Sequence, residues 1–277
     1  MPERCLVVTD MDGTLLNHHD YRVDAARPML AKLQQASIPV IFNTSKTLAE
    51  LLELVRQLDN QHPFIVENGS AIYIPRDYFP PSCMPAQVKP SQIAPDYLVL
   101  VMGMELDAIQ AFVDRVQPAA INFIDCTLEQ AMQLTGLDRR QVESARSRQF
   151  SIPLWFSDTA DEQDFAEQAI AAGFGVLRGG RFLHVLGSCD KGKSMLALRR
   201  LYRDCAQTGY TLIALGDSPN DLLMLQQADI AVLVKSPSSA TVALDHSCRI
   251  DTAQTAPEGW VEGVQAALNQ LSITLEE

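Results

Sequence analysis

Apolar residues in the first 75 positions form short continuous runs, separated by segments in which they recur every three or four residues. The continuous runs predict strands buried on both faces of a sheet, at Cys5–Asp10, Ile38–Phe42 and Phe64–Val66. The spaced segments predict two amphipathic helices, the first capped by Asp24 and the second entered at Ser45 or Thr47. Strand, helix, strand, helix, strand is the βαβ pattern. The chain therefore predicts an α/β protein with a doubly wound, Rossmann-like parallel sheet.

The composition changes over residues 75–95, where six prolines indicate a linker. Beyond it, strands alternate irregularly with helices, and Gly179-Gly180 is a hairpin signal. Strands are predicted at Tyr97–Met102, Asn122–Asp125, Ile152–Phe156, Phe174–Leu177 and Arg181–Leu186, and helices at Leu106–Val116, Arg139–Arg146 and Glu162–Ala171. The first pattern then resumes with a helix at Met195–Cys205 and a strand at Thr211–Leu215. We predict an inserted α+β domain over residues 78–187, within a core formed by residues 1–77 and 188–277.

Two acidic clusters follow apolar runs that lie far apart in the sequence. Asp10 and Asp12 come at the end of the first strand, and Asp217 and Asp221 follow the apolar run Leu212–Leu215. Ionised carboxylates this close repel one another, and burying them costs several kcal/mol each unless a cation or hydrogen-bond donors compensate. Because both clusters stand at the carboxyl ends of predicted parallel strands, we expect one shared site around a hard divalent cation.

Simpler interpretations of the first cluster are weaker. An isolated Asp12-Gly13 pair is most often only a turn, but the second acidic cluster would then have no explanation. A calcium-binding loop that began at Asp10 would have Leu15 in place of its glycine and Tyr21 in place of its bidentate glutamate. We therefore favour a site built from both clusters.

Bulk properties restrict the partners. The 277 residues are 47% hydrophobic and carry a net charge of −12, which argues against nucleic acid and anionic membranes because both are recognised by basic surfaces. Only about four consecutive apolar residues precede Asp10, too few for a signal peptide, and no run reaches the ~18 residues of a membrane span. We expect a soluble, cytoplasmic protein that acts on a small molecule.

Four motifs, in order, resemble those of the haloacid dehalogenase phosphatase superfamily over nearly the whole chain. They are DMDGT at Asp10–Thr14, a strand-end hydroxyl at Thr44, Lys191 within DKGKS, and GDSPND at Gly216–Asp221. The insertion between the second and third motifs resembles the type IIB cap of that superfamily. Because the core motifs recognise only a phosphoryl group, we expect side chains of the cap to select the substrate.

This resemblance implies a phosphomonoesterase. Asp10 would attack phosphorus and form an aspartyl-phosphate, and Asp12 would protonate the leaving alkoxide and later activate water. Thr44 and Lys191 would bind the phosphoryl oxygens, and a Mg²⁺ ion would offset the repulsion between the nucleophile and the phosphate. The implied metal ligands are Asp10, Asp12, Asp217 and Asp221, with Asp12 offering its backbone carbonyl and Asp221 either binding directly or orienting Asp217.

Further strings resemble the mannosyl-3-phosphoglycerate phosphatase family. They are Asn43–Thr47, Glu67–Gly69, Gly180–Val185 and Pro257–Trp260. The resemblance implies a substrate with both a phosphate and a carboxylate, hydrolysed to mannosylglycerate and phosphate. Lys46 and Arg181 are candidate cations for that substrate, and Asn220 is a further candidate contact. Another sugar-phosphate phosphatase of the superfamily, of the sucrose-phosphate or Cof-like kind, is the alternative.

A different class of protein also fits one motif. Gly187–Ser194 matches the phosphate-binding loop GxxxxGK[ST], and Asp217 could then end a Walker B strand. Against this nucleotide-binding interpretation, Asp190 would stand inside a loop that must cradle phosphates, and too few strand patterns follow the loop. It also leaves DMDGT unexplained. A binding protein without hydrolytic activity is the remaining alternative.

Overall fold

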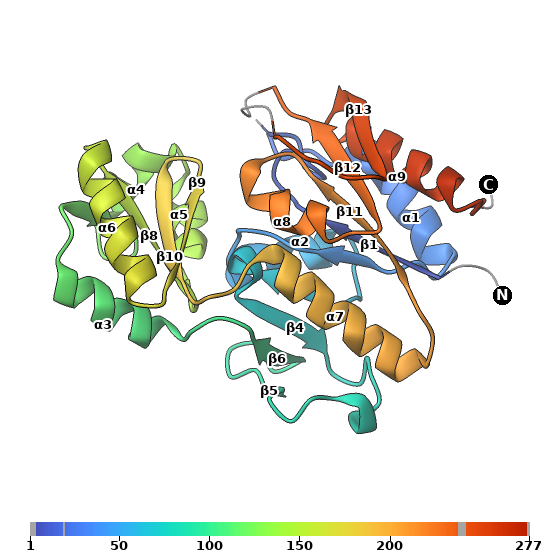
Figure 1. Ribbon diagram of the computed structural model, residues 1–277, viewed down its shortest axis with the longest axis horizontal. Coiled ribbons are helices and arrows are strands. Elements are labelled where there is room, and N and C mark those ends of the chain that lie inside the picture. Colours follow the sequence, from blue (N-terminus) through green and yellow to red (C-terminus); the bar gives the residue numbers. More distant parts are fainter. Residues whose placement is uncertain (1–3, 19, 238–241, 276–277) are drawn as a thin grey trace.

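A five-stranded parallel sheet organises the larger part of the computed structural model, which describes residues 4–18, 20–237 and 242–275 (Figure 1). Its strands, in the order β13-β12-β11-β1-β2, are Arg249–Thr255, Ile230–Lys235, Thr211–Gly216, Cys5–Thr9 and Val40–Phe42. All four strand pairs are parallel. Strand β1 leads outward to β2 on one side and neighbours β11 on the other, so the strand order reverses between β1 and β11. Ligands of doubly wound sheets bind at such a point, beyond the carboxyl ends of the strands.

Helices cover both faces of this sheet, as predicted for a doubly wound fold. Residues Cys5 and Val7 of β1 point into one hydrophobic cluster and Leu6 and Val8 into the other. The first cluster contains α1 (Arg27–Gln35), α2 (Leu48–Gln57) and α9 (Glu258–Gln270), and the second contains α7 (Lys191–Ala206) and α8 (Leu222–Gln226). Both faces of β1 are buried, which is the physical reason for its continuous apolar sequence.

A second, antiparallel sheet extends the core. Its order is β3-β4-β6-β5, with bounds Phe64–Val66, Ala71–Pro75, Tyr97–Val101 and Lys89–Pro90. The third predicted strand of the βαβ pattern, β3, therefore pairs mainly with β4 and joins the parallel sheet only through an Asn43–Ile65 bridge. The strand predicted from Tyr97 forms, but it pairs with β4 of the core instead of with the inserted domain.

The inserted segment forms its own α+β unit, at the left of Figure 1. Its antiparallel sheet has the order β7-β8-β10-β9, with bounds Ala120–Asn122, Ser151–Phe156, Phe182–Leu186 and Gly175–Gly179. Its helices are α3 (Leu106–Val116), α4 (Leu128–Thr135), α5 (Arg139–Arg146) and α6 (Thr159–Ala171), of which α4 was not predicted. The boundaries at residues 78 and 187 stay a prediction, and the pairing of β6 favours a start of the insertion after Val101.

Local capping agrees with the sequence at one helix and differs at another. Thr47 caps α2 through a capping box with Glu50, which is one of the two predicted entry points. Asp24 does not cap α1, because it opens a short 3-10 turn and the helix begins three residues later, at Arg27. Among the described residues, no helix is long and apolar enough to span a membrane.

Candidate active site

Three carboxylates meet at the point where the strand order reverses. Asp10 follows β1, Asp217 follows β11, and Asp221 ends the short turn Pro219–Asp221 behind Asp217. All three side chains are buried, and each can place one oxygen atom within 4.8 Å of the others. The two acidic clusters of the sequence therefore form one site, as their strand-end positions predict.

Lys191 lies at the centre of this cluster. Its Nζ atom is 2.6 Å from Oδ1 of Asp10 and 2.7 Å from Oδ1 of Asp221, and its side chain is fully buried. Burial works to lower the pKa of Lys191, but the carboxylates of Asp10 and Asp221 outweigh burial and raise it above its usual value. The lysine therefore stays charged and offers an ammonium group beside Asp10.

Close backbone packing fixes the position of Lys191. Asn43 donates from Nδ2 to the Lys191 carbonyl at 3.0 Å, which ties the end of β2 to the start of α7. Gly69 has a φ of +93°, and a Cβ atom there would lie 2.3 Å from the carbonyl carbon of Asp190. Ser194, on the next turn of α7, donates a hydrogen bond to the Gly69 carbonyl. Within the Glu67–Gly69 string, Gly69 thus acts through its backbone, because only glycine permits this approach.

The acidic cluster has more negative charge than Lys191 can offset. Burial and the neighbouring Asp221 raise the pKa of Asp10 well above its usual value, although Lys191 opposes this. Burial and Asp221 also raise the pKa of Asp217 to about 6, although Thr14 donates to its Oδ1 at 3.2 Å. Three carboxylates with one ammonium leave an excess charge of about −2 in a buried, oxygen-rich site. This arrangement fits a hard divalent cation.

Asp221 is held differently from the other two carboxylates. Its Oδ2 accepts hydrogen bonds from the backbone nitrogens of Asp217 and Ser218, at 3.1 and 3.2 Å, and from the Ser218 hydroxyl. Its Oδ1 accepts from Lys191. Because both oxygens already have donors, Asp221 is suited to orient Asp217 and Lys191.

Asp12 points away from this cluster, toward Lys46. The two side chains form an ion pair of 2.9 Å, and Lys46 also lies 4.9 Å from the centre of the Tyr21 ring. The second carboxylate oxygen of Asp12 is buried and has no hydrogen-bond partner among the described residues. Thr44 is fully buried, and its hydroxyl oxygen accepts from the backbone nitrogen of Lys46 at 3.2 Å.

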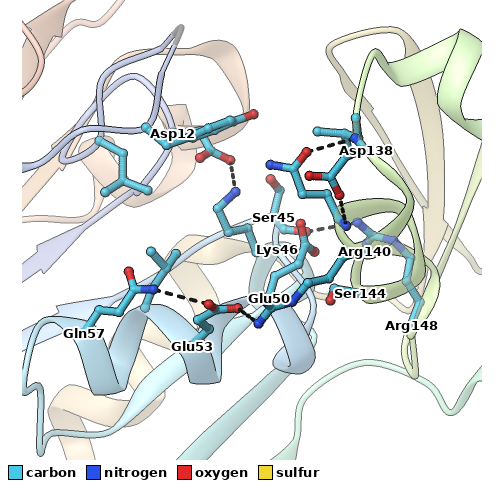
Figure 2. A pocket seen from close by; sticks show the side chains of 15 residues that line it. Asp12, Ser45, Lys46, Glu50, Glu53, Gln57, Asp138, Arg140, Ser144 and Arg148 are labelled. Atoms are coloured by element: carbon cyan, nitrogen blue, oxygen red, sulfur yellow. Dashed lines mark hydrogen bonds and ion pairs between the residues drawn. The ribbon is translucent and has the colours of Figure 1, made fainter.

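A cavity of about 430 Å³ opens beside Asp12, between the core and the inserted domain (Figure 2). The core side is lined by Asp12, Tyr21, Ser45, Lys46, Glu50 and Glu53, and the opposite side by Asp138, Arg140, Gln141, Ser144 and Arg148. Side chains of the inserted domain therefore reach the site. Arg140 and Arg148 were not predicted, although the arginines on and just after the predicted helix Arg139–Arg146 indicate that this segment is basic.

Two predicted substrate contacts lie outside this cavity. Arg181 is exposed on the turn between β9 and β10, where its guanidinium donates to the Leu134 carbonyl at 2.8 Å. Asn220 donates to the side chain of Asn68 at 3.3 Å and lines a separate cavity of about 230 Å³ beside Lys191. Of the predicted substrate contacts Lys46, Arg181 and Asn220, only Lys46 lines the cavity beside Asp12. The roles of Arg181 and Asn220 stay predictions.

The phosphate-binding-loop interpretation is not favoured by the geometry. The Asp190 carboxylate accepts a hydrogen bond from the backbone nitrogen of Lys193 at 2.8 Å and so occupies the N-terminus of α7. The Lys193 ammonium lies 3.4 Å from the same carboxylate and donates to the Ser188 carbonyl. A helix N-terminus that already binds its own carboxylate is not open to a triphosphate.

Known proteins resemble the chain in both sequence and fold. A model of the haloacid dehalogenase-like hydrolases matches residues 7–80. A glucosyl-3-phosphoglycerate/mannosyl-3-phosphoglycerate phosphatase of Persephonella marina is 31% identical over 271 residues, 96% of this chain and 98% of that protein. A phosphatase of the same name from Methanococcoides burtonii is 39% identical over 239 residues, 84% and 85% of the two chains. The structure of a subclass IIB sugar phosphatase of this superfamily has the same fold, with a TM-score of 0.61, 14% identity and coverage of 98% and 100%.

Proposed function

The chain belongs to the haloacid dehalogenase-like phosphatases, and from this membership we propose that it hydrolyses mannosyl-3-phosphoglycerate to mannosylglycerate and phosphate with the help of Mg²⁺. The glucosyl analogue would be its second substrate, since relatives are named for both. The observation that carries the proposal is the buried cluster of Asp10, Lys191 and Asp217 beside a cavity into which Asp12 opens. In this proposal Asp10 would be the nucleophile, the buried carboxylates would form the cation site, and Asp12 would be the proton donor.

Asp10 would be the nucleophile. One of its oxygens forms a bond to phosphorus while the bond from phosphorus to the leaving alcohol oxygen breaks. Asp12 gives its proton to that oxygen, and then accepts a proton from the water that attacks the aspartyl-phosphate. Phosphate leaves and Asp10 is restored. Lys191 and Thr44 would hold the phosphoryl oxygens during both steps, and the ammonium of Lys191 already contacts Asp10.

Mg²⁺ would be held by Asp10, Asp217 and the backbone carbonyl of Asp12, with Asp221 positioned behind them by its backbone donors. When bound, the ion supplies positive charge that lets an anionic nucleophile approach an anionic phosphate. Gly13 brings the loop onto this site, because its φ is +82° and a Cβ atom would lie 2.6 Å from Oδ2 of Asp217. The residues present therefore fit a magnesium ion.

Mg²⁺ affinity should depend on pH through Asp217. Its pKa is raised to about 6, so below pH 6 most of the carboxyl groups are protonated and must release a proton before they can bind the ion. We expect the affinity to fall about tenfold from pH 7 to pH 5, measured by calorimetric titration of Mg²⁺. Without Mg²⁺, the raised pKa lowers the stability of the fold as the pH rises from about 4 to 6. An affinity that does not change over this range would exclude Asp217 as a ligand.

The substrate is tested with a panel of phosphate esters at equal concentrations in the presence of Mg²⁺. We expect kcat/KM for mannosyl-3-phosphoglycerate to exceed the values for mannose-6-phosphate and sucrose-6-phosphate by about 10²-fold or more, because a buried cation left without its carboxylate is unfavourable. Treatment with EDTA should remove the activity, and added Mg²⁺ should restore it. Equal or faster hydrolysis of either sugar phosphate would contradict the substrate but not the phosphatase class.

The remaining properties follow from the sequence alone. The strongly acidic net charge disfavours binding to nucleic acid or anionic membranes. A cytoplasmic location agrees with a small, anionic substrate. On these grounds we propose that the protein is cytoplasmic and binds neither nucleic acid nor anionic membranes.

A further inference from the structure

One segment of the cap is anchored on the core. It follows α5 and contains Arg148, whose side chain is only 7% exposed and borders the cavity beside Asp12. Phe150 of the same segment is 3% exposed and belongs to the hydrophobic cluster of the core that contains α1, α2 and α9. Besides the two chain connections, this segment therefore attaches the cap to the core.

Glu67 of the core is the polar part of this anchor. Its carboxylate accepts from the backbone nitrogens of Gln149 and Phe150, at 2.9 and 3.2 Å, and from the hydroxyl of Ser151 at 2.5 Å. The nearest guanidinium atom of Arg148 is 3.7 Å away. Glu67 is 1% exposed and has a φ of +47°, a conformation that few non-glycine residues adopt. The position of Arg148 relative to the core is thus fixed by a buried carboxylate.

The donors of Arg148 are only partly used. Nη1 donates to the Ser151 hydroxyl at 2.9 Å and Nη2 to the Ser45 carbonyl at 3.3 Å. Nε is buried and has no hydrogen-bond partner in the described part of the chain. Nη1 and Nη2 each carry two hydrogens and donate one of them in the described part of the chain, so the guanidinium group keeps donors for a ligand in the cavity that Arg148 lines. The planar guanidinium group suits a carboxylate, which can accept from two of its nitrogens.

The other cations of the cavity are less suited to this role. Lys46 is engaged by Asp12 at 2.9 Å, and Arg140 has an 80% exposed side chain that pairs with Glu53 at 3.0 Å. Arg148 alone among the described cations lining this cavity is both buried and left with a free donor. It also contacts Ser45, and Asp12 lines the same cavity. A group bound to Arg148 would therefore share this cavity with the ester oxygen that Asp12 would protonate.

We propose that Arg148 is the specificity-determining residue whose guanidinium group binds the glycerate carboxylate of the leaving alcohol. This inference rests on the function proposed above, and it assigns to Arg148 the role predicted for Lys46 and Arg181. The anchor at Glu67 and Phe150 holds the guanidinium at a fixed distance from Asp12. An ester whose carboxylate reaches Arg148 while its phosphate lies at Asp10 is then positioned for hydrolysis, and an ester without a carboxylate is not.

The test compares wild type with Arg148→Met on a matched pair of ligands, 3-phosphoglycerate and glycerol 3-phosphate, which differ only in the carboxylate. Wild type is expected to be inhibited by 3-phosphoglycerate at least 10-fold more strongly, and the variant should lose this preference. For mannosyl-3-phosphoglycerate, the variant should lose about 30- to 100-fold in kcat/KM, mainly through KM. Hydrolysis of p-nitrophenyl phosphate, which has no carboxylate, should change by no more than about threefold. Arg148→Lys should not restore the preference, because lysine lacks Nε and the planar fork.

Arg139→Met is the matched control, since Arg139 starts α5, the helix that precedes Arg148, but is 72% exposed and does not line the cavity. Thermal unfolding of each variant checks the fold. Equal losses on both kinds of substrate would show that Arg148 only supports the structure and would overturn the proposal. Wild type that does not distinguish the two ligands would also overturn it. Failure of the proposed function itself is different, because wild type would then release no phosphate from mannosyl-3-phosphoglycerate.

Discussion

Asp10→Asn is expected to lower kcat by about 10⁴-fold or more without lowering the stability of the protein. The amide has no anionic oxygen with which to attack phosphorus, so the covalent route is lost at its first step. The amide fills the same space as the carboxylate, and it removes one of three buried negative charges that share a single ammonium group. Because repulsion inside the cluster falls, we expect an equal or slightly higher midpoint of thermal unfolding.

Phosphate release and thermal unfolding are measured on the same preparation of Asp10→Asn. Asp114→Asn on helix α3 is the matched control, since that aspartate is exposed and accepts a hydrogen bond from Gln110 of the same helix. Asp12→Ala should behave differently, because it slows both steps but leaves Asp10 able to retain phosphate, which intact-mass spectrometry would detect. More than a trace of wild-type activity in Asp10→Asn would contradict the covalent mechanism.

The catalytic half of the site could be predicted from the sequence because local patterns determine it. The apolar run before Asp10 and the one before Asp217 indicate buried parallel strands, and the parallel strands of one sheet bring their carboxyl ends to one edge. The doubly wound fold and the inserted domain are confirmed, and the structure brings Lys191 and Asp221 into the same cluster. Ordered motifs on strand ends therefore sufficed for these side chains.

The side of the cavity formed by the inserted domain could not be predicted, because it depends on contacts between distant segments. Arginine is almost always at the surface, and nothing near Arg148 in the sequence shows that Glu67, 81 positions earlier, keeps it buried. Arg181 was preferred because of a family string, but the antiparallel pairing of β9 with β10 places it on an exposed turn. The pairing of β6 with β4 was not predicted either, because local periodicity does not show which strands pair.

Lys191→Met should have the largest effect on stability, lowering the free energy of unfolding by about 3–5 kcal/mol in the absence of Mg²⁺. Lys191 is the only ammonium that the described residues place in contact with Asp10 and Asp221, and its side chain is fully buried. Its loss leaves three buried carboxylates without a protein cation. Added Mg²⁺ should recover part of the lost stability but little of the activity, because the phosphoryl oxygens still lack their ammonium donor.

Urea unfolding with EDTA and with saturating Mg²⁺, together with phosphate release, measures both effects. Lys193→Met, two residues along the same helix, is the control: its side chain is 56% exposed and its ion pair with Asp190 is a surface contact, so its loss should change stability by about 0.5 kcal/mol or less. The order of the two variants also separates the two classes of protein. A phosphate-binding loop would depend on Lys193, the lysine of its GK[ST] sequence, whereas a site built on Asp10 depends on Lys191. Loss of activity in Lys193→Met with an active Lys191→Met would therefore reject the aspartyl-phosphate mechanism.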